Sequence, residues 1–230
     1  ITRMRVFITG HRGYIGSLLF EKLEESIGID IREGYNLLTC ELPDNIDLIY
    51  HLAAQSQVES SWHDPLHDLD NIRITARLVH AYPHAKIIYA NSCAAVDPVS
   101  PYGFSKWAAG EYLKRFHDNW VSCIFPNIYG RGGHSVVDVF AGEKEVIVYG
   151  SGKQTRDFVH IDDIIEGLIM AQNWPMGEYF MGSGKSTSVL ELAGNKKITY
   201  APARKEPFEV VVPNTTPSWM PKIDLMEYYG

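Results

Sequence analysis

The sequence lacks several features that would place it in common protein classes. Its 21 Lys and Arg residues are outnumbered by 28 Asp and Glu, so the formal net charge is −7 and no basic stripe is present. That balance argues against a partner with a phosphate backbone, and we expect no nucleic acid. No apolar run approaches the length of a membrane span, so we expect no membrane partner either.

Cysteine is also scarce. Cys40, Cys93 and Cys123 are odd in number and far apart, which predicts neither a disulfide framework nor a metal site. We therefore expect no metal, and a reduced cytoplasmic compartment is the natural location.

The remaining composition is that of a globular protein. The chain has 230 residues, of which 45% are hydrophobic and 21% charged, enough for one core or two unequal lobes. Short apolar runs at residues 5–9, 27–29, 47–54, 86–91 and 121–125 predict strands. They alternate with predicted helices at residues 17–25, 64–82 and 101–118. This alternation predicts an α/β fold, a Rossmann-type doubly wound parallel sheet.

The alternation weakens after residue 126, where Gly, Pro and short runs dominate. We therefore expect a Rossmann-type domain over residues 1–126 and a small, reduced C-terminal lobe over residues 127–156 and 174–230. Residues 157–173, with a helix predicted from 161 to 173, are expected to return to the first domain.

A glycine-rich turn follows the first strand. Gly10, Gly13 and Gly16 lie between that strand and a helix, a pattern that lets backbone N–H groups approach a pyrophosphate at the helix N-terminus. Asp30 follows Gly10 by twenty residues and can accept both hydroxyls of an adenosine ribose, which favours NAD.

Two arginines complicate the choice of cofactor. Arg12 and Arg32 flank Asp30 in the predicted site, and a guanidinium can meet the 2′-phosphate of NADP. Asp30 would repel that phosphate. We give the acid more weight and predict NAD, with Arg12 otherwise a solvated loop residue.

A catalytic pair is predicted in the helix at residues 101–118. Tyr102 and Lys106 are four positions apart and therefore share a helix face. A neighbouring ammonium favours the phenolate and would lower the pKa of Tyr102 toward a range useful for a general base. A solvated helix face is the alternative for this pair taken alone.

Several motifs of this sequence occur in the order typical of one family. Through them the sequence resembles the extended short-chain dehydrogenase/reductases and, among these, the nucleotide-sugar epimerase/dehydratase group. The similarity runs from Met4 to about Asp163. The matching segments are residues 9–16, 51–55, Ser60 with Asp64, Pro65 and Asn71, residues 100–106, 127–130 and 149–163.

This resemblance implies a set of residues that bind the cofactor. They are Gly10, Arg12, Gly13, Tyr14, Ile15, Gly16, Asp30, Ile31, Asn36, Leu37, Leu52, Ala53, Ala54, Gln55, Asn71, Ala90, Tyr102, Lys106 and Phe125.

It also implies catalytic roles. Tyr102 would remove the proton of a sugar hydroxyl, Lys106 would hold the nicotinamide ribose, and Ser92 would hydrogen-bond the same hydroxyl. Substrate-binding residues are carried over as Ser92, Tyr102, Asn127, Arg156 and Arg204, of which Arg204 has a poorly matching neighbourhood and a plain surface role as its alternative. The implied partners are a nucleotide sugar, expected to be a UDP-hexose, and a second copy of the chain in a homodimer.

The residues after Ser92 favour one branch of the group. The 4,6-dehydratases use an Asp-Glu pair there to eliminate water, and the related decarboxylases a Glu, whereas this sequence has Cys93 and Ala94. Oxidation and re-reduction without elimination is epimerisation. The segment Gln55 to Ser60, which follows Ala53 and Ala54, also resembles the AAQxxVxxS segment of bacterial and archaeal UDP-galactose 4-epimerases. We therefore expect interconversion of UDP-galactose and UDP-glucose through a 4-keto sugar.

Other parts of the sequence depart from the group's pattern. Residues 95–97 stand where V-Y-G is usual, the stretch between Gly130 and Gly150 is short, and so is the tail after Gly184. The substrate lobe is thus reduced, and its pocket is either open or closed by a partner subunit. Two alternatives follow: a reductase that consumes NAD(P)H, and a catalytically silent dinucleotide-binding protein.

Overall fold

The computed structural model describes residues 3–204 and 209–229. The chain forms two compact units, the first made of Ile1–Ile124 and Leu168–Tyr179, the second of Phe125–Gly167 and Phe180–Gly230. Residues 157–173 are expected from the sequence to return to the first unit. The segment that does so is 168–179, and the two ranges share residues 168–173.

The first unit contains a six-stranded sheet in the order β10-β5-β4-β3-β1-β2. Its strands are β1 (Val6–Thr9), β2 (Ile27–Ile29), β3 (Leu48–His51), β4 (Lys86–Ser92), β5 (Trp120–Phe125) and β10 (Gly177–Phe180). β1 pairs in parallel with both β2 and β3, and β3 pairs in parallel with β4. The predicted Rossmann-type sheet is confirmed.

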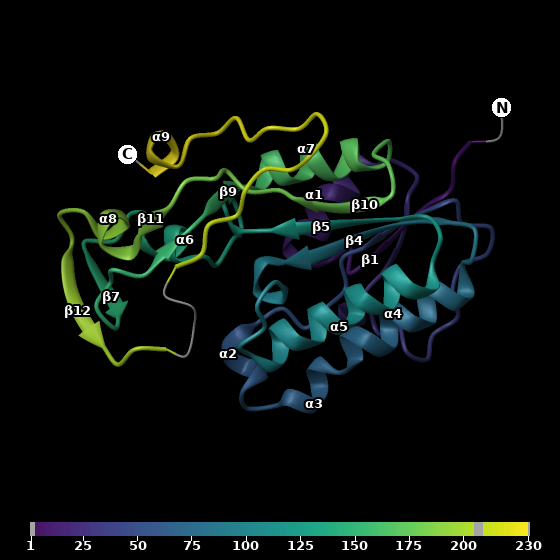
Figure 1. The fold of residues 1–230 in the computed structure, drawn as a ribbon, viewed down its shortest axis with the longest axis horizontal. Coiled ribbons are helices and arrows are strands. Elements are labelled where there is room, and N and C mark those ends of the chain that lie inside the picture. The colour runs from purple at the N-terminus through teal and green to yellow at the C-terminus, as the bar shows by residue number, and fades with distance from the viewer. Residues whose placement is uncertain (1–2, 205–208, 230) are drawn as a thin grey trace. The chain divides into compact units, whose positions relative to one another are not determined.

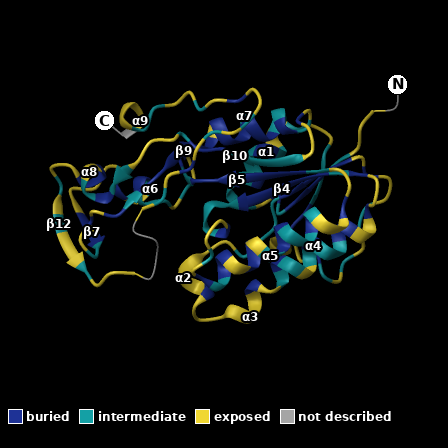
Figure 2. Ribbon diagram, in the orientation of Figure 1, coloured by how far each residue is buried: buried dark blue, intermediate teal, exposed yellow. Residues whose placement is uncertain are grey.

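The strands of this sheet are apolar because both of its faces are covered. All four residues of β3 are buried, and β4 and β5 are dark blue along most of their length in Figure 2. Continuous apolar runs of this kind are typical of parallel strands between helical layers.

The first unit also contains several helices. They are α1 (Tyr14–Lys22), α2 (Val58–Ser61), α3 (Pro65–Asp68), α4 (Asp70–Ala81) and α5 (Pro101–Phe116), with short 3₁₀ turns η1 (Ile31–Glu33) and η2 (Cys93–Ala95). α4 and α5 run side by side on one face (Figure 1). Phe7, Ile49 and Ile87 from the strands pack with Leu78 of α4 and Leu113 of α5 in the core of this unit.

Two helix boundaries differ from those expected. The single helix predicted at residues 64–82 is divided at Leu69, whose N–H donates to the Leu66 carbonyl at 3.2 Å and closes a tighter turn than an α-helix. α1 begins at Tyr14 rather than at residue 17, so the helix starts within the glycine-rich segment.

The second unit is built from two-stranded sheets around a smaller core. Its elements are β6 (Asn127–Tyr129), α6 (Val136–Phe140), β7 (Glu145–Tyr149), β8 (Thr155–Arg156), β9 (Phe158–His160), β11 (Thr187–Ser188), α8 (Val189–Ala193), β12 (Lys197–Ala201) and α9 (Leu225–Tyr229). The pairs are β11 with β8, β12 with β7, and β6 with β9. Helix α7 (Ile161–Ala171) begins in this unit and ends in the first.

The core of the second unit joins β6, α6, β7 and α8. Tyr129, Val137, Phe140, Val148 and Leu192 are among its most deeply buried members. Among the helices of the described residues, none combines the length and the apolar character needed to cross a membrane.

Candidate active site

The strand order reverses beside β1, which has β2 on one side and β3 on the other. In open parallel sheets, ligands bind at such a switch point, outside the carboxyl ends of the strands. Gly10 follows β1, Asp30 follows β2 and Leu52 follows β3, so the sequence-predicted cofactor residues converge on this edge.

Gly10 makes the turn after β1. Its φ of +74° is a conformation that L side chains rarely adopt, and a Cβ at this position would lie 2.8 Å from the backbone of Ala53. The Gly13 N–H donates to the Gly10 carbonyl at 2.9 Å. A Cβ on Gly16 would overlap that same carbonyl, so α1 can only pack this closely with glycine there.

The N-terminus of α1 is suited to a phosphate. Gly13 is the N-cap residue, and no side chain of the described residues caps this end. The first N–H groups of a helix have no intrahelical partners and carry a partial positive charge. The turn therefore fits a pyrophosphate held by backbone groups.

Asp30 is buried at the end of β2. Its Oδ2 accepts the Arg12 N–H at 2.9 Å, and its Oδ1 accepts the Arg32 N–H at 2.8 Å. A carboxylate has about four lone-pair sites, so capacity remains for the hydroxyls of a ribose. These residues fit NAD, with Asp30 as the ribose acceptor.

The turn after β3 is fixed by Thr9 and Asn71. Thr9 Oγ1 accepts the N–H groups of Leu52 and Ala53 at 3.1 and 3.2 Å. Asn71 Oδ1 accepts the Gln55 N–H at 2.8 Å, and its Nδ2 donates to Ser105 Oγ at 2.9 Å. Asn71, expected to bind cofactor, thus connects the cofactor turn to helix α5.

Other predicted cofactor residues have varied surroundings. Asn36 Oδ1 accepts the Leu38 N–H at 2.8 Å, and Leu37 is part of the hydrophobic core. Ile31 is exposed, whereas Ala90 and Phe125 are buried near the ends of β4 and β5. Their contacts with adenine or nicotinamide remain predictions.

The structure brings Ser92 and Tyr102 together. Ser92 ends β4, and its Oγ accepts the Ala94 N–H at 3.2 Å. Tyr102 lies in the first turn of α5, where Pro101 is accommodated because its missing N–H would have no helical partner. Burial raises the pKa of Tyr102 to about 12, while a side-chain hydrogen bond with Ser92 acts in the opposite direction.

Lys106 is buried on the same helix, one turn after Tyr102. Its Nζ lies 4.1 Å from the ring centroid of Tyr89, whose hydroxyl donates to the Lys106 carbonyl at 3.2 Å. Burial lowers the pKa of Lys106 to about 7. The expected lowering of the Tyr102 pKa is wrong for the chain by itself, because desolvation penalises the phenolate more strongly than its neighbours stabilise it.

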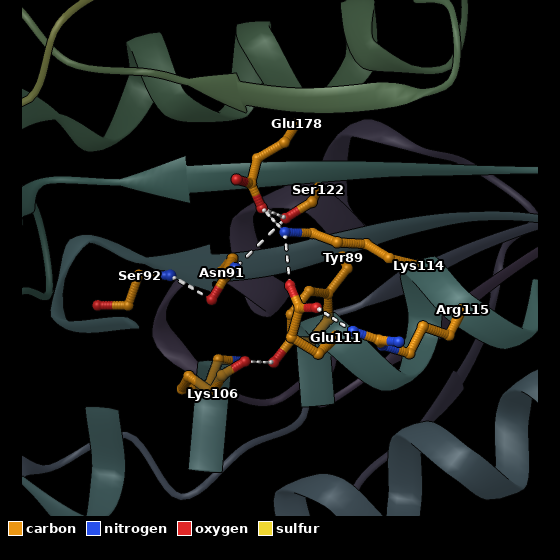
Figure 3. Close-up of polar contacts among 9 residues, drawn as sticks. All are labelled: Tyr89, Asn91, Ser92, Lys106, Glu111, Lys114, Arg115, Ser122 and Glu178. Carbon is orange, nitrogen blue, oxygen red and sulfur yellow. Dashed lines mark hydrogen bonds and ion pairs between the residues drawn. The ribbon is translucent and has the colours of Figure 1, made fainter. Parts of the chain in front are cut away.

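A polar network that sequence reasoning missed begins beside Ser92 (Figure 3). The Ser92 N–H donates to Asn91 Oδ1 at 2.9 Å, and Asn91 Nδ2 donates to Ser122 Oγ at 3.3 Å. Ser122 Oγ lies 3.4 Å from Glu178 Oε2, which pairs with Lys114 Nζ at 2.7 Å. The only sequence signal for it is a polar residue, Asn91, within an apolar strand.

His51 is a satisfied core residue, as expected. Its Nδ1 and Nε2 lie 2.9 Å from the hydroxyls of Thr9 and Thr75. Burial lowers its pKa to about 3, and the positive charge of Lys106 adds to this shift. Within residues 3–204 and 209–229, no group of three or more His, Cys, Asp or Glu side chains could hold a metal ion.

The predicted substrate residues Asn127, Arg156 and Arg204 all lie in the second unit. The Asn127 N–H donates to the Asp157 carbonyl at 3.1 Å. Arg156 is buried and donates from Nη1 to the Thr155 carbonyl at 2.7 Å. The Arg204 guanidinium stacks 3.7 Å from the ring centroid of Tyr149.

Asp157 organises this part of the second unit and was not singled out from the sequence. It is fully buried and accepts the Ser183 hydroxyl at 2.7 Å and the N–H groups of Gly184 and Val212 at 3.0 and 3.1 Å. Its position directly after Arg156 was the available signal. The carboxylate fixes three chain segments around Arg156.

Residues 6–179 match the model of the NAD dependent epimerase/dehydratase family. The chain therefore belongs to this family, whose cofactor is NAD. The resemblance inferred from the motifs is confirmed.

The chain is at most 29% identical in sequence to the relatives named below. A putative UDP-glucose 4-epimerase of Methanocaldococcus jannaschii is 28% identical over 81% of this chain and 79% of its own length. A UDP-glucose 4-epimerase of Mycolicibacterium smegmatis is 29% identical over 82% of this chain and 80% of its own length. A structure of UDP-glucose 4-epimerase from Thermotoga maritima with UDP-glucose is 21% identical, with a TM-score of 0.82 over 97% of this chain and 96% of its own.

Proposed function

We propose that the chain is an NAD-dependent nucleotide-sugar epimerase that interconverts UDP-galactose and UDP-glucose at C4 through a 4-keto sugar. The family includes both epimerases and dehydratases, so membership alone leaves the reaction open. The observation that carries the proposal is the site around Ser92. It pairs a hydrogen-bonded Tyr102 with residues, Cys93 and Ala94, that provide no acid for elimination of water.

The proposed roles of the chain's residues follow from their chemistry. Tyr102 Oη takes the proton of the C4 hydroxyl and later returns it, and Ser92 Oγ hydrogen-bonds the same oxygen. Bound NAD supplies the hydride acceptor and donor and, in its oxidised form, a positive charge that favours the phenolate. Lys106 holds the nicotinamide ribose, and its burial keeps water from competing for that contact.

The nucleotide must stay bound while the 4-keto sugar rotates about its diphosphate linkage and presents its other face. Asn127, Arg156 and Arg204 are proposed to bind the diphosphate, a task for which guanidinium groups are well suited. The role of Arg156 is supported by the hydrogen bonds of the neighbouring Asp157 carboxylate, which fix the chain around it. Arg204 is supported only by its stacking on Tyr149.

The test is to incubate purified protein with UDP-galactose, without added cofactor, and to follow UDP-glucose by NMR. We expect conversion by the wild type and a loss of about a thousandfold or more in Tyr102→Phe, because the phenylalanine cannot exchange the proton. No conversion, even with NAD supplied, would contradict the substrate assignment. Turnover only with stoichiometric NADH or NADPH would identify a reductase instead.

A homodimer in the cytoplasm is also part of the proposal. Phe104, Trp107 and Phe116 are large apolar side chains on α5 that remain exposed in the single chain. The scarcity of cysteine supports the compartment. Light scattering that gives the mass of one chain at micromolar concentration would contradict the dimer.

A further inference from the structure

Two guanidinium groups stand close to the proposed adenosine ribose site. Arg12 belongs to the glycine turn and Arg32 to η1, and the backbone N–H of each donates to Asp30. A guanidinium at this place can bind a 2′-phosphate, the group that distinguishes NADP from NAD. The cofactor preference therefore depends on where these two cations point.

The Arg12 guanidinium is held by Glu33. Its Nε and Nη2 atoms lie 2.6 and 2.5 Å from Glu33 Oε1. Two donors on one carboxylate oxygen restrict the position of the guanidinium, and the carboxylate offsets its positive charge. The Arg32 guanidinium donates from Nη1 to the Arg12 carbonyl at 2.5 Å, which directs part of this group toward the backbone.

Glu33 is itself held on a second side. Its Oε2 lies 3.2 Å from Nε2 of His11, a residue that is only 3% exposed. The His11 ring packs against Phe20 with centroids 4.8 Å apart, and a Cβ on Gly28 would overlap the ring. A glycine in β2 thus makes room for a buried imidazole, which supports the carboxylate that faces Arg12.

We propose that Glu33 determines the preference for a dinucleotide without a 2′-phosphate, because it holds Arg12 in an ion pair and leaves Asp30 to bind the ribose hydroxyls. Asp30 repels a 2′-phosphate, and Glu33 prevents Arg12 from compensating for that repulsion. The inference rests on the dinucleotide site of the proposed function but not on the choice of sugar. The competing interpretation is an ordinary surface ion pair, which has little effect on anything nearby.

Competition between the two dinucleotides tests this inference without measuring activity. Purified protein is equilibrated with equal, excess concentrations of NAD⁺ and NADP⁺ and separated from unbound nucleotide. The bound nucleotides are released by heat and quantified by chromatography. Incubation continues until the bound ratio is constant, so that the ratio reports relative affinity even when cofactor is retained from expression.

The variants are Glu33→Gln, Arg12→Gln and the double variant, with Glu166→Gln as the matched control. Glu166 pairs with Lys222 in the second unit, so its substitution removes an exposed ion pair far along the chain from this turn. We expect Glu33→Gln to raise the bound NADP to NAD ratio about tenfold, equivalent to about 1.4 kcal/mol. The double variant should return to the wild-type ratio within about threefold, because the gain acts through Arg12.

An unchanged ratio in Glu33→Gln, or an equal rise in the double variant, would overturn the inference while leaving the proposed function intact. Failure of the wild type to retain either dinucleotide would contradict both. The two failures are therefore distinguishable in the same experiment.

Discussion

At the scale of single residues, the site is defined by two buried ionisable groups on one helix. Burial raises the pKa of Tyr102 to about 12 and lowers that of Lys106 to about 7, so each group resists its charged form in the chain by itself. Ser92 is the neighbour that favours the phenolate. A site of this kind becomes an effective base only when substrate and cofactor add their own charges and hydrogen bonds.

The pKa of Lys106 predicts how stability varies with pH. The folded-state pKa is about 7, below the ordinary value of 10.5, so between these pH values the unfolded chain binds more protons at this residue. The contribution of Lys106 to stability therefore rises as pH increases through that window, and below pH 7 the full cost of a buried charge remains.

We accordingly expect Lys106→Met to be more stable than the wild type at pH 6, with a difference that shrinks toward pH 9. Urea unfolding at pH 6, 7.5 and 9 measures the free energies. Lys144→Met, at an exposed lysine, should show no such trend. A difference between wild type and Lys106→Met that does not change with pH would contradict the assigned burial.

The sequence predicted which residues form the site wherever a motif marks them. It did not predict how the surroundings of each residue change its pKa or its contacts. The i, i+4 spacing places Tyr102 and Lys106 on one face of α5, which the structure bears out. The direction of the Tyr102 pKa shift depends on desolvation by residues from several elements, and no local pattern carries that information. Glu33 likewise gains its role only when η1 brings it to His11 and Arg12.

At the scale of elements, the Asn91 network joins β4, β5, β10 and α5 (Figure 3). Asn91 orients the backbone at Ser92 and is anchored through Ser122 to Glu178 and Lys114. Asn91 is a positioning residue in this account, because it reaches the reacting atoms only through Ser92.

Removal of this anchor should change turnover more than binding. We expect Asn91→Ala to lower kcat by roughly tenfold to a hundredfold with a KM changed by less than about threefold, because a small displacement of Ser92 weakens its contact with the reacting oxygen. Steady-state kinetics of the wild type, Asn91→Ala and the exposed control Asn195→Ala provide the comparison. A kcat equal to that of the wild type, or a loss confined to KM, would refute the positioning role.

The elements of the first unit were largely predictable, whereas the short strands of the second unit were not predicted. Apolar runs located β1 to β5, and the glycine turn located the switch point. The break at Leu69 was not predicted, because the amphipathic pattern continues across it while the backbone tightens. β10 was missed as well, since Gly177–Phe180 is short and only half-buried and becomes a strand by pairing at the sheet edge.

At the scale of the whole molecule, the chain combines a dinucleotide-binding unit that follows the family pattern with a smaller second unit. The first carries Ser92, Tyr102 and Lys106, and the second carries Asn127 and Arg156. The family and the NAD cofactor follow from the match over residues 6–179, which spans most of the first unit and part of the second. We expect the identity of the sugar to depend on the second unit, whose stretch between Gly130 and Gly150 and tail after Gly184 are short for the group.

In the proposed reaction, hydrogen is removed from C4 of the sugar and returned to C4 within one active site. The most direct measurement is NMR of UDP-glucose formed from UDP-galactose carrying deuterium at C4, in ordinary water and without added cofactor. The account predicts that deuterium stays at C4 of the product. Loss of the label to solvent, or no product at all, would contradict it.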